Sequence, residues 1–216
     1  MNLEYIQAIL PALLKGTWQT LQVFFLTLVL SLPLGLPFAL GSISRFFPVR
    51  FLSKAYIWVF RGTPLMLQLF FVYYGLPIMF GPAFRMENTV AAVLTFTMNY
   101  AAYFAEIFRS GIQAIPAGQS EAATVLGYTR AQTFVRIILP QMTRIVLPPV
   151  TNEVITLVKD TSLAFALAYT EMFTLAKQIA AASASIMPLF IAGAFYYIFN
   201  FIVAWIMEYI EKKMRY

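Results

Sequence analysis

The sequence predicts an all-α integral membrane protein with five transmembrane helices and one further helix on the cytoplasmic side. Hydrophobic residues make up 61% of the 216 residues and charged residues only 11%, and the mean hydropathy is +0.76. A soluble domain of this size could not cover so much apolar surface. Because apolar runs recur along the whole chain, we expect residues 1–216 to form a single transmembrane domain.

Four apolar runs have the roughly 20 residues that a spanning helix needs, and they cover residues 18–40, 55–80, 89–108 and 188–207. A fifth run, 145–173, is mostly apolar but contains charged residues. An ionised side chain at the centre of a spanning helix costs about 2.5–3.5 kcal/mol when it faces lipid. The charges of the fifth run are therefore expected to face protein or a water-filled cavity.

The positions of Lys and Arg beside the spans predict the orientation of the chain. One set of connections holds most of them: Arg45, Arg50, Lys54, Arg61, Arg109, Arg130, Arg136, Arg144, Lys212, Lys213 and Arg215. The opposite set holds only Lys15, Arg85 and Lys177. This asymmetry places the N-terminus outside and the C-terminus in the cytoplasm, together with the long connection 110–144.

Several functional classes are excluded by composition. The chain has no Cys and no His, so the common zinc sites and the Ser-His or Cys-His nucleophile pairs cannot form. The net charge of +6 is spread over helix ends and does not form a continuous basic face for nucleic acid. The sequence also contains no GxxxxGK[ST] phosphate loop. We expect neither a metal, a cofactor nor an enzymatic activity in this chain, and any ATP must be bound by a partner.

Local signals in the long cytoplasmic connection predict two short helices with a turn between them. Pro116 suits the first position of a helix, and Gly127 suits the left-handed residue that ends one. Thr129 and Gln132 have the spacing of a capping box at the start of the next helix, which we expect to break at Pro140. The first of these helices would be presented at the inner face of the membrane.

This connection resembles the EAA loop of the membrane subunits of bacterial-type ABC importers. The matching residues are Glu121, Ala122 and Ala123, then Gly127, then Ile-Leu-Pro at 138–140. In that family the loop docks into a cleft of the ATPase, and the resemblance implies that the chain lies in a bacterial-type inner membrane. The resemblance therefore implies that Glu121, Ala122, Ala123 and Gly127 couple this chain to an ATPase.

Three other segments are similar to the polar amino acid branch of the same family, and together the matches span roughly residues 16–213. They are Phe-Arg-Gly-Thr-Pro-Leu at 60–65, Ala-Glu-Ile-Phe-Arg at 105–109 with Gly-Ile at 111–112, and Lys-Asp-Thr-Ser-Leu at 159–163. The resemblance implies two cytoplasmic ATPase subunits that bind ATP and Mg, and an extracytoplasmic binding protein. It also implies a second membrane subunit, either another copy or a homologue.

The charges of the fifth run predict the kind of substrate. Glu153 and Asp160 are seven residues apart, so on a helix they lie on one face about 10 Å from each other. Two aligned acids favour a ligand with positive charge at two ends, such as arginine, lysine or histidine. Family members often have Asn-Gln or Asn-Ser where this chain has Asn152-Glu153, so selectivity would depend mainly on Glu153. Candidate groups for the α-carboxylate are Asn99, Thr161 and Ser162, with Gln68 as an addition.

Alternatives remain open at this point. Glu153 or Asp160 could form an internal salt bridge with Lys159 or with an Arg of another span. The importer could then carry a neutral polar amino acid such as glutamine. An ion-driven carrier that uses the two acids as proton sites is a further possibility, and a membrane-embedded enzyme is the weakest, because the acids are too far apart to share one reacting bond.

Overall fold

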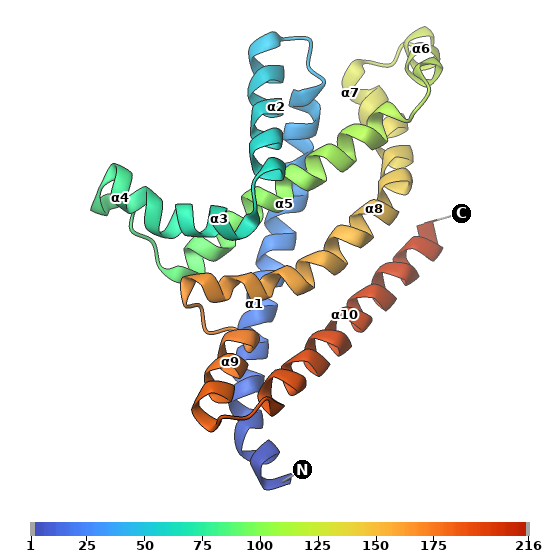
Figure 1. Cartoon of the computed structure of the whole chain (residues 1–216). Coiled ribbons are helices and arrows are strands. Elements are labelled where there is room, and N and C mark those ends of the chain that lie inside the picture. Colours follow the sequence, from blue (N-terminus) through green and yellow to red (C-terminus); the bar gives the residue numbers. More distant parts are fainter. Residues whose placement is uncertain (1–2, 215–216) are drawn as a thin grey trace.

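The structure is a computed structural model that describes residues 3–214, with side chains from Gln7 onward. All secondary structure in these residues is helical (Figure 1). The long helices are α1 (Leu3–Ser42), α2 (Phe47–Gly62), α5 (Asn88–Gln113), α8 (Leu139–Asp160) and α10 (Met187–Met214). Arg215, one of the cations used to predict orientation, lies outside the described residues. The predicted all-α class is confirmed.

Short helices connect the long ones. They are α3 (Leu65–Phe70), α4 (Leu76–Phe80), α6 (Ala117–Val125), α7 (Arg130–Thr133) and α9 (Met172–Ser183), with π-helical turns η1 (Phe71–Gly75) and η3 (Phe134–Ile138) and 3-10 turns η2 (Pro82–Phe84) and η4 (Thr161–Leu167). Figure 1 shows the α1–α2 connection and helices α6 and α7 at one end of the molecule, and the N-terminal end of α1 with α9 at the other.

Among the described residues, α1, α5 and α10 are long and apolar enough to cross a membrane, and α2 with α3–α4 would be a fourth crossing if the bent pair is one span. The predicted run 55–80 therefore falls in two helical segments, and the chain bends by 107° between them. The run 145–173 is also divided, because α8 ends at Asp160 and a 3-10 turn follows. The count of five spans stays a prediction.

Helices α1 and α5 form the centre of the main core. Their backbones approach closely at Gly35, where an added Cβ would lie 2.9 Å from the Cβ of Phe104. Helix α8 packs against α5 on one side and α10 on the other. The outward faces of α1 and α10 carry exposed apolar side chains, including Val29 and Trp205, as expected for surfaces that meet lipid.

Pro140 does not break the chain as the sequence predicts. A π-helical turn precedes it, in which the Leu139 N–H donates to the carbonyl of Phe134, five residues back. Pro140 therefore falls in the first turn of α8, where a missing N–H is tolerated, and the helix continues to Asp160. Helix α8 is joined to the cytoplasmic connection without an intervening break.

A second, smaller core joins α1, α9 and α10 around a buried carboxylate. Glu171 is 0% exposed and caps α9, accepting hydrogen bonds from the N–H of Phe173 at 2.7 Å and of Thr174 at 2.6 Å. It also accepts from the Thr174 hydroxyl at 2.8 Å and from the Tyr196 hydroxyl of α10 at 2.9 Å. Each of the two carboxylate oxygens of Glu171 therefore accepts two hydrogen bonds from the protein itself.

Candidate functional site

A sharp bend after α2 positions the first part of the candidate site. Thr63 is extended, with φ −120° and ψ 145°, because the residue before a proline is disfavoured in the helical region. Pro64 then begins α3. Gln68 stabilises this bend, because its amide nitrogen donates to the carbonyl of Phe60 at 2.8 Å and to the hydroxyl of Thr63 at 2.7 Å. The bend leaves Arg61 at the exposed end of α2.

Asn99 of α5 fixes the bend to the rest of the bundle. Its amide nitrogen donates to the carbonyl of Phe60 at 3.1 Å and to the side-chain oxygen of Gln68 at 3.0 Å. Both residues were predicted as substrate ligands. In the structure, Gln68 stabilises the bend and does not line the cavity that is described in the next paragraph. Asn99 stabilises the bend and also lines that cavity.

A cavity of about 470 Å³ lies between the α2–α3 bend, α5 and α8. Both predicted acids, Glu153 and Asp160, line it from α8, together with Tyr100 and Tyr103 of α5 and Arg61 of α2. The seven-residue spacing does bring the two acids to one face of one helix, as expected. Because the cavity is open and both acids are only partly buried, a polar molecule of amino acid size could reach them.

The two acids differ in their hydrogen bonding. Asp160 accepts a hydrogen bond of 2.8 Å from the Tyr100 hydroxyl, which orients the carboxylate toward α5. Glu153 has neither a hydrogen bond nor an ion pair with any residue that the structure describes. Lys159 is exposed and likewise forms no ion pair in this part of the chain. The internal salt bridge considered above is absent from the described residues.

Arg61 supplies a positive group to the same cavity. The sequence analysis used this residue for topology and as part of the family match at 60–65, and gave it no role in substrate binding. Its guanidinium lies 5.2 Å from the centre of the Tyr103 ring and 3.9 Å from a carboxylate oxygen of Glu106. Glu106 is already engaged by Arg109, whose Nε donates to it at 2.9 Å. Since the only ion-pair contact of Arg61 among the described residues is long and shared, its charge remains available to a ligand.

Thr161 and Ser162 do not line the cavity. Their hydroxyls donate to carbonyls of the preceding turn, Thr161 to Val158 and Ser162 to Lys159, each at 2.7 Å. These bonds stabilise the change from α8 to the 3-10 turn η4. A role for either residue as a ligand stays a prediction, and the geometry assigns their hydroxyls to the end of the helix.

The cytoplasmic connection adopts the predicted pair of helices. Helix α6 ends before Gly127, which is left-handed with φ +80°, and Thr129 and Gln132 form the predicted capping box. Pro116 precedes α6 by one residue. Glu121 and Ala122 are exposed and Ala123 is buried, so the first two are accessible to a partner while the third anchors the helix to its own chain.

Comparison with known proteins gives concordant matches along the chain. The family described as "Binding-protein-dependent transport system inner membrane component" matches residues 31–216. The arginine transport system permease protein ArtQ of Bacillus subtilis is 37% identical, over 100% of this chain and 99% of the relative. The L-cystine transport system permease protein TcyB of the same organism is 36% identical, over 96% and 88% of the two chains.

A solved structure has the same fold. The crystal structure of an amino acid ABC transporter with histidines is 29% identical in sequence, with a TM-score of 0.88 over 99% of this chain and 99% of that one. The match covers both the bent region after α2 and the cytoplasmic connection.

Proposed function

From the premise that this chain belongs to the family of inner membrane components of binding-protein-dependent transport systems, we propose that it is the permease subunit of an ATP-driven amino acid importer with a preference for cationic substrates. The relatives whose names mention arginine and cystine support an amino acid as the substrate. Because those names differ, the cationic preference has to be argued from the cavity.

The observation that carries the preference is the set of charges around the cavity: two carboxylates, Glu153 and Asp160, and one guanidinium, Arg61. Arginine and lysine carry the complementary set, with two cationic groups and one carboxylate. The α-carboxylate would bind Arg61 as a charge-assisted pair, and the α-amino and side-chain cations would bind the two acids. Since Arg61, Glu153 and Asp160 form no ion pair with one another in the described residues, no salt bridge within the cavity has to be broken when such a ligand enters.

Transport would then proceed by alternating access in a complex. Two membrane subunits, either identical or homologous, would open in turn to the outside and to the cytoplasm, and an extracytoplasmic binding protein would deliver the substrate. Two cytoplasmic ATPases would bind ATP and Mg and act on α6 through the exposed Glu121 and Ala122. The N-terminus would lie outside and the C-terminus in the cytoplasm, which agrees with the gathering of α6, α7 and the α1–α2 connection at one end (Figure 1).

The proposal is tested by uptake of labelled arginine into proteoliposomes that contain the assembled complex, its binding protein and internal ATP. Lysine and histidine should compete with arginine, and glutamine should not. Equal competition by glutamine would refute the cationic preference while leaving the importer in place. Uptake that continues without ATP and collapses with the proton gradient would instead support the ion-driven carrier.

A further inference from the structure

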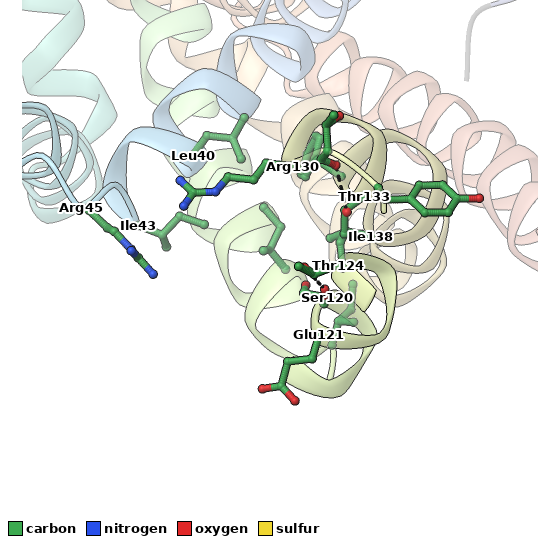
Figure 2. A pocket seen from close by; sticks show the side chains of 14 residues that line it. Leu40, Ile43, Arg45, Ser120, Glu121, Thr124, Arg130, Thr133 and Ile138 are labelled. Carbon is green, nitrogen blue, oxygen red and sulfur yellow. Dashed lines mark hydrogen bonds between the residues drawn. The ribbon is translucent and has the colours of Figure 1, made fainter. Parts of the chain in front are cut away.

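A second cavity, of about 890 Å³ (Figure 2), lies at the end of the molecule that holds α6, α7 and the α1–α2 connection, opposite the N-terminal end of α1 (Figure 1). One wall is apolar and lies at the ends of two helices that are long and apolar enough to span a membrane. It is formed by Leu40 of α1, Ile43 directly after α1, and Ile112 near the end of α5. The other wall comes from α6, α7 and η3. The cavity therefore lies at the level where spanning helices leave the hydrocarbon region.

Two arginines face this cavity, Arg45 from the α1–α2 connection and Arg130 from α7. Both are exposed, and neither forms an ion pair or a ring contact with another residue in the range 7–214. Glu121 is the one acid on the cavity wall, and its carboxylate lies apart from both guanidinium groups (Figure 2) and forms no ion pair with either of them. The charge facing the cavity is thus positive beside an apolar wall.

We propose that this cavity binds an anionic phospholipid of the cytoplasmic leaflet, with its phosphate between Arg45 and Arg130 and an acyl chain against Leu40, Ile43 and Ile112. Guanidinium groups bind phosphate through paired N–H donors, and basic pockets between spanning helices at the cytoplasmic face are suited to anionic headgroups. A free anion would leave the apolar wall uncovered, whereas a phospholipid covers both walls.

Because of the position of the cavity, a bound lipid should affect the coupling between the transmembrane bundle and the cytoplasmic helices. The walls of the cavity join α1 and α5, which form the core of the bundle, to the helices that would contact the ATPases. A lipid in this place would bridge the transmembrane bundle and the cytoplasmic helices, so its loss should loosen α6 and α7 without altering the substrate cavity. This inference concerns a separate site and stands whether or not the substrate preference proposed above is correct.

The test measures lipids retained by the purified full chain after incorporation in nanodiscs that contain equal amounts of phosphatidylglycerol and phosphatidylcholine, using native mass spectrometry. The wild type should retain phosphatidylglycerol selectively, and R45Q with R130Q should lower that retention about 30-fold. The matched control is R50Q with R136Q, which removes the same charge from the same end of the molecule, at residues that do not line the cavity. The pair R45K with R130K keeps the charge but loses the paired N–H donors, so its retention should fall between that of the wild type and that of R45Q with R130Q.

Several results would overturn the proposal. Equal loss in the control pair would show a nonspecific charge effect, and unchanged retention in R45Q with R130Q would show that the cavity is not the site. Displacement of the lipid by glycerol phosphate at millimolar concentration would identify a site for soluble anions. Loss of the lipid when the ATPase subunits are added would identify the cavity as part of the ATPase interface.

Discussion

The run 145–173 contains acids in two different environments, Glu153 and Asp160 before η4 and Glu171 after it. Glu171 is fully buried and receives four hydrogen bonds from Phe173, Thr174 and Tyr196. Glu153 lines a cavity and has no such partner among the described residues, and Asp160 has a single one, Tyr100. One acid has all its hydrogen-bonding capacity used by the fold, while the other two keep most of theirs.

This difference separates a structural acid from a ligand-binding one in a membrane helix bundle. A carboxylate with a complete set of donors stabilises the chain around it and gains nothing from a ligand. A carboxylate without donors is costly to bury, so it is retained only where a ligand or water reaches it. The comparison predicts that substitutions at the two sites change different properties: stability at Glu171, and substrate binding around Glu153 and Asp160.

The largest effect is expected for Glu171→Ala. It removes the cap of α9 and leaves buried donors without an acceptor, which should lower the free energy of unfolding by about 3 kcal/mol. Thermal unfolding of the detergent-purified permease measures this loss. Glu208→Ala, an exposed acid on α10, is the control and should leave the midpoint unchanged. A stable Glu171→Ala protein with impaired uptake would place Glu171 in the transport pathway.

The next largest effect is expected for Arg61→Met. It removes the guanidinium assigned to the substrate carboxylate, so arginine affinity should fall about 30-fold. Agmatine, which lacks that carboxylate, should bind equally to both proteins. Binding to the purified complex measures both ligands, and Lys54→Met, an exposed cation on the same helix, is the control. An equal loss for agmatine and arginine would contradict the assignment.

A smaller effect is expected for Tyr100→Phe. The change deletes the hydroxyl that orients Asp160, which should weaken arginine binding about fivefold because one hydrogen bond contributes on the order of 1 kcal/mol. Tyr103→Phe is the matched control, since Tyr103 lines the same cavity but faces Arg61 with its ring. If both variants weaken binding equally, the Tyr100–Asp160 hydrogen bond has no specific role.

Local signals predicted the cytoplasmic connection well, because each depends on neighbouring residues. The left-handed Gly127 and the capping box of Thr129 and Gln132 need no tertiary information, and both are confirmed. The family resemblance is also confirmed. The break expected at Pro140 is wrong, because a π-helical turn absorbs the proline, and such turns leave no simple signature in sequence.

The cavity was predicted only in part. Helical spacing placed Glu153 and Asp160 on one face. It could not show that Asn99 holds the bend after α2, since its contact with Phe60 joins residues 39 positions apart. Arg61 was overlooked for the same reason. The sequence Arg-Gly-Thr-Pro at 61–64 does signal a cation at a helix end before a break, and it could have marked Arg61 as a candidate.

Equilibrium binding of arginine and of glutamine to the purified complex, with Glu153 and with Glu153→Gln, tests the account most directly. The account predicts that arginine affinity falls about 30-fold and that glutamine affinity does not, because the lost carboxylate pairs only with a cationic side chain. The melting temperature should not change, since no hydrogen bond from the described residues is lost. Unchanged arginine affinity in Glu153→Gln would contradict the claim that this acid selects the substrate.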